Sequence, residues 1–239
     1  MKTRHSAQRG VALLVVLVAL LLTSIALLGS LQVGWLAERS VGSESDSQRA
    51  FAAAEALIRD AELDILGLRA DGTRCDSDPL AASPCRSATP AGLFFPQTDE
   101  DLDTLHARVS AGHRQCLQGI CLPDTVDTLQ EAWPQELDAM TSGQGDTSVA
   151  ATYGQFTGAD PQSDGNPLLN AAAPRAWYWV EVFRYAHAAG ILKPATNTPL
   201  PDRRHPFVYR ITAYAKGLKS GTRVHLRSVF VPYPQNPTP

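Results

Sequence analysis

The sequence predicts an α+β fold in which a long N-terminal helix packs on a C-terminal antiparallel sheet. The first half of the expected helix is a run without charged residues, from Gly10 to Ala37, and its amphipathic second half ends near Leu66. From Ala176 onward, the chain alternates apolar and polar residues as strands do. Since the helix stripe and one sheet face are both apolar, we expect them to bury each other.

The N-terminal segment combines a basic start with an apolar run long enough to cross a membrane. Three basic residues precede Gly10: Lys2, Arg4 and Arg9. About 20 mostly apolar residues suffice for a spanning helix, and the basic flank would stay cytoplasmic. A cleaved signal peptide ending at Ser24-Ile25-Ala26 and a plain signal anchor fit the same hydropathy. Hydropathy alone leaves these alternatives open.

The following segment is predicted to continue the helix as its amphipathic half. No Pro or Gly occurs between Ser43 and Leu66, and Gly67 is a suitable stop. Apolar residues recur at spacings of three and four, and Leu57 widens the stripe that they form: Phe51, Ala54, Ile58, Ala61 and Ile65. We interpret this stripe as the spine of a domain.

Two stretches of this region resemble a known family. The motif QRG at Gln8–Gly10 runs directly into VALLVVLVALLL, and ERSVGSESDSQRAFAAAEALIRDAE follows at Glu38–Glu62. Together they resemble the PilX-type minor pilins of type IV pilus systems, with RAFAAAEALIRDAE (Arg49–Glu62) the most specific part. The phrase YRITA at Tyr209–Ala213 is also similar to strand phrases of that family.

The resemblance implies how the chain is processed and organised. Prepilin peptidase would cut between Gly10 and Val11 and methylate the new N-terminus, so that residues 1–10 are a leader. Residues 11–37 would be a transmembrane and filament-core helix, and residues 38–66 its amphipathic continuation. Residues 67–239 would form a periplasmic globular domain with disulfide-stapled loops and C-terminal strands.

The resemblance also implies a location and a set of partners. The protein would cross the inner membrane once, with its C-terminal domain in the periplasm, and then enter the pilus filament or its tip at the cell surface. Its partners would be other minor pilins, the major pilin, prepilin peptidase, the inner-membrane assembly platform and, as a further candidate, a tip adhesin. No cofactor is implied.

Val15 departs from the pattern of most type IV pilins, which carry a glutamate at the fifth mature position. Counted from Val11, that position is Val15. In major pilins the carboxylate is thought to neutralise the N-terminal amine of the preceding subunit, and a buried charge needs such a partner. A subunit without a predecessor has no amine to neutralise. Val15 therefore favours a place at or near the tip, or in an initiating complex.

The four cysteines indicate disulfides in an oxidising compartment. They are Cys75, Cys85, Cys116 and Cys121, and three pairings are possible. The sequence-local pairing, Cys75–Cys85 with Cys116–Cys121, is favoured. A zinc site is the alternative, but the CX9C and CX4C spacings lack the tight pairs that zinc prefers.

The middle of the chain, from Gly67 to about Pro174, is predicted to be loop-rich, with short helices near Asp99–Arg108 and Thr128–Ala139. Two acidic clusters raise the question of calcium. The cluster Asp99, Glu100, Asp101 and Asp103 is more simply the first turn of a helix. The cluster Asp160, Asp164 and Asn166 lacks the regular calcium-loop spacing and its bidentate Glu. We expect no metal site at either cluster.

The last third of the chain predicts three consecutive antiparallel strands: Ala176–Ala186, Pro206–Gly217 and Thr222–Pro232. No acidic residue follows Asp202, whereas seven basic residues do: Arg203, Arg204, Arg210, Lys216, Lys219, Arg223 and Arg227. Phosphate contacts to DNA are one interpretation. Strand alternation already explains their placement, so a solvated face or complementarity to an acidic subunit is favoured. Nucleic acid is not an expected partner.

Function classes can then be compared. The formal net charge of −3 gives no sign of a nucleic-acid binder. No catalytic motif is present, and Glu181 reads as a carboxylate on the wet face of a strand, so no enzyme is predicted. The first hypothesis is a minor pilin that initiates or caps a type IV pilus. The alternatives are a type II secretion pseudopilin at a pseudopilus tip, or a signal-anchored periplasmic binding module.

Overall fold

In the computed structural model the chain divides into two compact units, Met1–Ser45 and Asp46–Pro239, and each is described by itself. The structure describes the following residues: 8–75, 84–86, 93–123, 138–141, 148–170, 174–185, 201–202 and 205–232. The short helix predicted at Thr128–Ala139 lies outside these residues except for its last two.

One helix, α1 (Gln8–Leu66), contains both the apolar run and the amphipathic segment. It ends where the sequence predicted, because Gly67 follows with φ of 64°, a conformation that only glycine adopts easily. Within the described part of the chain, no helix is both long enough and apolar enough to cross a membrane. That residues 11–37 form a membrane span therefore stays a prediction.

The second unit is built on a six-stranded mixed sheet in the order β1-β2-β4-β5-β6, with β3 also paired to β4. The three long strands are β4 (Ala176–Arg184), β5 (Phe207–Lys216) and β6 (Arg223–Phe230). They are consecutive and antiparallel, as predicted. Three two-residue strands complete the sheet: β1 (Cys116–Leu117), β2 (Ile120–Cys121) and β3 (Ala151–Thr152). The parallel pairing of β2 with β4 was not predicted.

The helical elements after α1 are short. The predicted helix at Asp99–Arg108 is α2 (Asp99–Ser110), which begins with a capping box between Thr98 and Asp101. The acidic cluster there is thus the first turn of a helix, as the simpler interpretation held. Further short helices among the described residues are η1 (His113–Gln115), α4 (Pro161–Asp164) and η4 (Pro167–Leu169).

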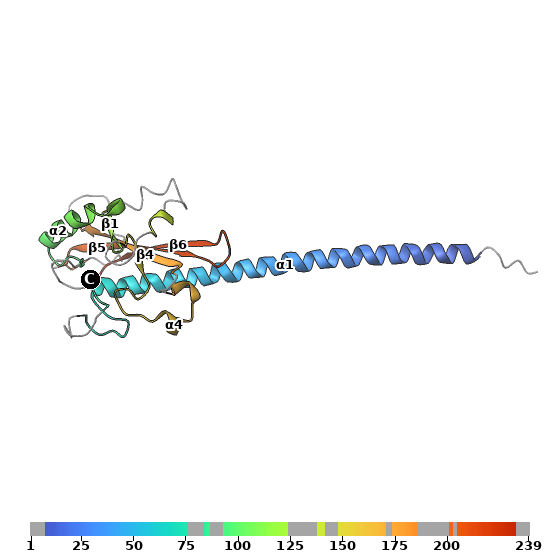
Figure 1. Cartoon of the computed structure of the whole chain (residues 1–239), viewed down its shortest axis with the longest axis horizontal. Helices are drawn as coiled ribbons and strands as arrows, with labels where there is room; N and C mark the ends of the chain where they lie inside the picture. Colours follow the sequence, from blue (N-terminus) through green and yellow to red (C-terminus); the bar gives the residue numbers. More distant parts are fainter. Residues whose placement is uncertain are drawn as a thin grey trace, which may run out of the picture. The chain divides into compact units, whose positions relative to one another are not determined.

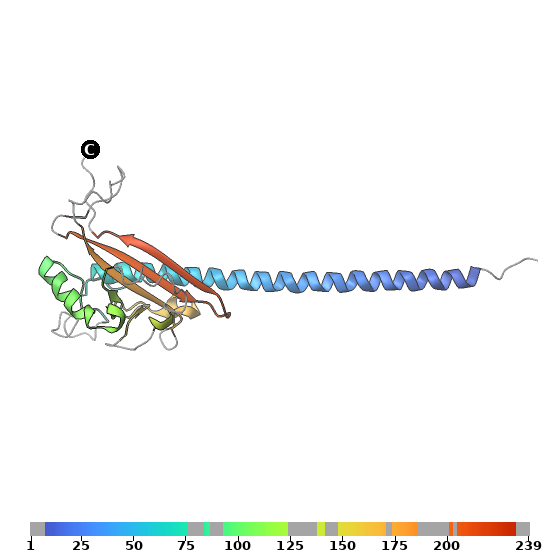
Figure 2. The same cartoon turned by 90° about the horizontal axis from the view of Figure 1, so that it is seen from above.

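The main core lies between one face of the sheet and residues 46–66 of α1, whose ribbon runs beside β4, β5 and β6 in Figures 1 and 2. Strand β5 contributes its predicted apolar face, which includes Tyr209, Ile211 and Ala213. A second, smaller cluster covers the opposite face around Trp179 and Met140. Strand β4 is therefore buried on both sides.

The predicted helix stripe is right in part. Ala54, Leu57, Ala61 and Ile65 are buried, but Phe51 is 46% exposed, so its assignment to the core was wrong. Ile58 is only partly buried. The buried face of α1 consists largely of alanines, which allow the helix backbone to approach the sheet closely, and it also carries three aspartates.

Candidate functional site

The buried face of α1 carries three aspartates, each of which holds a different segment of the domain. Asp46, Asp60 and Asp64 are 2%, 2% and 5% exposed. A buried carboxylate is unfavourable unless hydrogen bonds or an opposite charge compensate it. Each of the three is compensated, and together they fasten the globular domain to its helix. We take this set of contacts as the candidate site, because the helix is the part that the sequence links to assembly.

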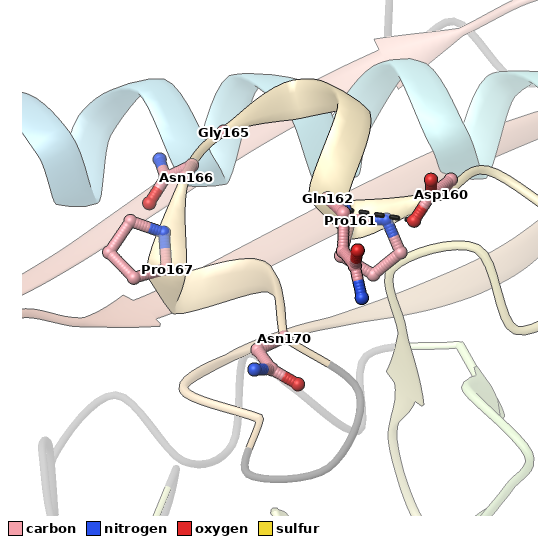
Figure 3. Close-up of a pocket in the computed structure, with 7 residues that line it drawn as sticks. All are labelled: Asp160, Pro161, Gln162, Gly165, Asn166, Pro167 and Asn170. Carbon is pink, nitrogen blue, oxygen red and sulfur yellow. Dashed lines mark hydrogen bonds between the residues drawn. The ribbon is translucent and has the colours of Figure 1, made fainter.

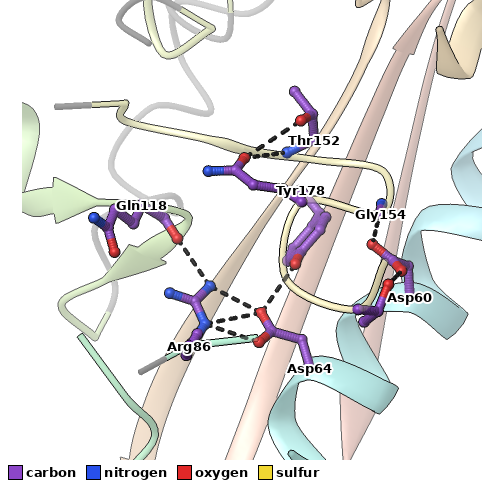
Figure 4. Close-up of polar contacts among 9 residues, drawn as sticks. Asp60, Asp64, Arg86, Gln118, Thr152, Gly154 and Tyr178 are labelled. Carbon is purple, nitrogen blue, oxygen red and sulfur yellow. Dashed lines mark hydrogen bonds and ion pairs between the residues drawn. The ribbon is translucent and has the colours of Figure 1, made fainter. Parts of the chain in front are cut away.

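Asp64 is the centre of a buried polar network (Figure 4). Arg86 donates three hydrogen bonds to its carboxylate, at 2.8, 3.0 and 2.8 Å, and the Tyr178 hydroxyl donates a fourth at 2.9 Å. Burial, followed by the nearby carboxylates of Asp64 and Asp60, raises the pKa of Tyr178 above its usual range. Tyr178 therefore remains a protonated donor to Asp64.

Arg86 connects this network to both disulfide loops. It directly follows Cys85 of the Cys75–Cys85 disulfide, and its Nη2 donates to the carbonyl oxygen of Gln118 at 2.9 Å. Gln118 lies in the turn closed by the Cys116–Cys121 disulfide. The guanidinium also lies 3.7 Å from the ring centroid of Phe156, a cation–π contact. The two disulfides are the sequence-local ones.

Asp60, one turn before Asp64, holds the loop that follows β3. Its carboxylate accepts hydrogen bonds from the Gly154 N–H at 2.9 Å and from the Thr157 hydroxyl. Burial raises the pKa of Asp60 to about 6, although these two hydrogen bonds act in the opposite direction. The loop is thus attached to a carboxylate that titrates near neutral pH.

Asp46 holds the connection between β5 and β6. Its two carboxylate oxygens accept hydrogen bonds from the backbone N–H groups of Leu218 and Lys219, at 2.8 and 2.9 Å. Burial by itself would raise the pKa of Asp46, but these donors and the Thr222 hydroxyl outweigh it, with help from Arg49, and the pKa is lowered. Asp46 therefore stays ionised at neutral pH.

A fourth buried carboxylate, Glu181, corrects the sequence interpretation. It is fully buried on β4 rather than on a wet face, because the cluster around Met140 and the Cys116–Cys121 disulfide covers that side of the sheet. Arg210 on β5 donates to it at 2.7 and 3.0 Å. The pair joins neighbouring strands directly opposite each other.

Two members of the acidic cluster near residue 160, Asp160 and Asn166, line an open hollow of about 460 Å³ (Figure 3). The oxygens that raised the question of calcium serve as helix caps here. Asp160 accepts from the Gln162 N–H, and Asn166 accepts from the Leu168 N–H. The Asn166 amide also donates to the carbonyl of Arg49 on α1. Among the described side chains, no group of three could hold a metal ion.

Three of the described basic residues of the last strands, Arg210, Lys216 and Arg223, pair with carboxylates. Besides Arg210 with Glu181, Asp138 faces Lys216 at 2.8 Å and Arg223 at 3.4 Å. Arg203 and Arg204 lie outside the described residues. This pairing favours a structural role for these cations over a row of phosphate contacts.

The remaining predicted site residues lie in the first unit. Gly10 and Val11 belong to α1, and the Val11 side chain lies outside the described part. Val15 is 58% exposed in this unit. The three buried aspartates were missed by the sequence analysis. Their spacing offered a signal, since Asp60 and Asp64 lie three residues after Leu57 and Ala61, on the same helix face.

The fold is thus α+β, with a long N-terminal helix whose buried aspartates hold the domain by hydrogen bonds and by the Asp64–Arg86 ion pair. The family model for "Type IV pilus assembly protein PilX C-term" matches residues 117–232. The matched range contains β2 to β6, so it covers nearly the whole sheet. Comparisons with curated proteins and with solved structures found no match.

The match confirms the resemblance to PilX-type minor pilins that the N-terminal residues indicated, and it lies in a different part of the chain. Over residues 117–232, just under half of the chain, the protein is similar to the PilX-type proteins of type IV pilus assembly. This family consists of pilus assembly proteins rather than enzymes, and its members work with other pilus components such as pilins.

Proposed function

We propose that this chain helps to initiate a type IV pilus or sits at its tip, after prepilin peptidase has cut between Gly10 and Val11. Residues 11–37 would anchor it in the inner membrane, with the domain in the periplasm, and later pack among the helices of the filament. Its work is done at interfaces with other minor pilins, the major pilin and the assembly platform. The match of residues 117–232 to the PilX family supports a pilus role over a periplasmic binding module.

The early or tip position rests on Val15. A subunit in the body of a filament lies after another subunit, whose charged N-terminus needs a compensating carboxylate in an apolar surrounding. A valine cannot supply one. The chain is therefore suited to a place where no preceding amine has to be neutralised.

The mature N-terminus tests the processing step. Mass spectrometry of the protein from the native membrane is expected to give a methylated Val11. A chain that starts at Leu27 was cleaved as a signal peptide, and an intact Met1 marks an uncleaved anchor. Either of these results would overturn the pilin assignment. A type II secretion role would leave the methylated Val11 but place the protein outside pili.

The position in the filament is tested with Val15→Glu. If Val15 restricts the position of the subunit in the filament, the variant is expected to enter the filament shaft, whereas the wild-type protein is expected at one end only. Immunogold labelling along isolated pili measures this distribution, with Val16→Glu as a control that moves the charge by one position. A Val15→Glu variant that remains at one end of the pilus and still initiates assembly would refute the role given to Val15.

A further inference from the structure

The tip of the β5–β6 hairpin, residues 217–222, makes hydrogen bonds to α1 in addition to those that form the hairpin itself. Eight residue pairs join β5 to β6, and the Gly217 N–H donates to the Thr222 carbonyl at 2.9 Å to close the turn. These contacts form the hairpin without help from α1. The additional bonds from the Leu218 and Lys219 N–H groups to Asp46 therefore determine where the tip lies.

Gly217 shows how closely the tip approaches the helix. A Cβ at this position would collide with the carboxylate of Asp46 and would lie 2.6 Å from the Thr222 side chain. Only glycine allows the turn to reach the buried carboxylate. The tip is thus held rigidly, so its exposed side chains lose little freedom when they meet a partner.

The tip exposes one apolar and one cationic side chain next to each other. Leu218 is 51% exposed, and Lys219 and Ser220 are exposed as well. In the part of the chain that the structure describes, no carboxylate pairs with the Lys219 ammonium. The guanidinium of Arg49, 37% exposed, adds a second positive charge beside Asp46. The chain contains no acidic residue after Asp202.

We infer that this tip docks on another pilin-type subunit, which offers a carboxylate to Lys219 next to an apolar depression for Leu218. This inference rests on the proposed function and adds the surface used. Membrane binding would require a cluster of four or more basic residues or a broad apolar face. A single leucine with one or two cations instead fits the small, charge-complementary contact of a protein surface.

Site-specific photo-cross-linking of the full-length protein in pilus-assembling cells tests the contact. In one variant a photoreactive phenylalanine replaces Leu218. In a matched control it replaces Val229, which is 65% exposed at the other end of β6. We expect an adduct from position 218 to a chain with pilin-type peptides and at least about threefold less from position 229. Lys219→Glu should reduce the 218 adduct about three- to tenfold, whereas Lys219→Arg should leave it unchanged.

Three results would overturn the inference: equal adducts from both positions, adducts with lipid alone, or an unchanged yield with Lys219→Glu. The urea midpoint and both disulfides of each variant are measured to establish that the fold is intact. The N-terminus is sequenced in the same cells. A methylated Val11 without the 218 adduct refutes the surface and leaves the proposed function, whereas Met1 or Leu27 at the N-terminus refutes the proposed function by itself.

Discussion

Replacing Arg86 by methionine should lower the free energy of unfolding by about 3–5 kcal/mol, the range measured when one partner of a buried ion pair is removed. The side chains of Arg86 and Asp64 are 5% and 2% exposed, so water cannot replace the guanidinium. The variant loses three hydrogen bonds to Asp64 and one to the Gln118 carbonyl. Only the Tyr178 hydroxyl still compensates the buried carboxylate.

Urea unfolding of the full-length protein in detergent, followed by tryptophan fluorescence, measures the effect. With a denaturant slope of about 2 kcal/mol per molar urea, the midpoint should fall by about 1.5–2.5 M. The double variant Arg86→Met with Asp64→Asn is the control, because it removes the uncompensated charge together with its partner. It should be more stable than the single Arg86→Met variant.

The comparison of the free energies of unfolding of the single and double variants is the decisive observation. If Arg86 acts only through its packing on Phe156, methionine will keep most of that contact and the midpoint will hardly move. If Arg86→Met lowers the stability by less than about 1 kcal/mol, or if the double variant is the less stable of the two, the compensation of Asp64 by Arg86 is not what holds this region together.

Three further predictions concern neighbouring parts of the domain. Asp60 has its pKa raised from 3.8 to about 6, so its contribution to stability is fully present below pH 3.8 and is lost as the pH rises through about 6. Asp60→Asn should therefore flatten the pH dependence of the urea midpoint between pH 4 and 7 and remove up to about 3 kcal/mol of it; an unchanged dependence would refute the raised pKa. Cys75→Ser with Cys85→Ser should lower the free energy of unfolding by about 3 kcal/mol, and by less in the Arg86→Met background, because the disulfide also positions Arg86. Leu57→Ala should destabilise by about 2–5 kcal/mol and Phe51→Ala by less than about 1 kcal/mol, and similar losses would contradict the observed helix face.

The long strands and the end of α1 could be predicted because local sequence determines them. Alternation along β5 placed Tyr209 and Ile211 on the core face, and Gly67 marked the helix end. The prediction for Phe51 was wrong, because a spacing of three and four residues is compatible with two adjacent helix faces. The alanines that permit close packing were buried instead.

The polar contacts could not be predicted, because they join residues far apart in the sequence. Arg86 follows a cysteine in a loop, and nothing local shows that it meets Asp64, 22 positions earlier. Glu181 looked like a solvent-facing residue, since the sequence does not reveal that a second cluster covers that face of the sheet. The β1–β2 hairpin was read as loop because its strands have only two residues each.

The three aspartates help to define the register of the helix on the sheet, in addition to its apolar face. Four of the buried apolar residues of this helix face are alanines, Ala50, Ala53, Ala54 and Ala61, so only Leu57 and Ile65 among the described buried residues offer large side chains that fix its position by packing. A shift by one turn, about 5.4 Å, would carry one of Asp60 and Asp64 into the other's place, but it would separate the second of them, and Asp46, from their donors. We therefore infer that these carboxylates serve positional specificity more than net stability.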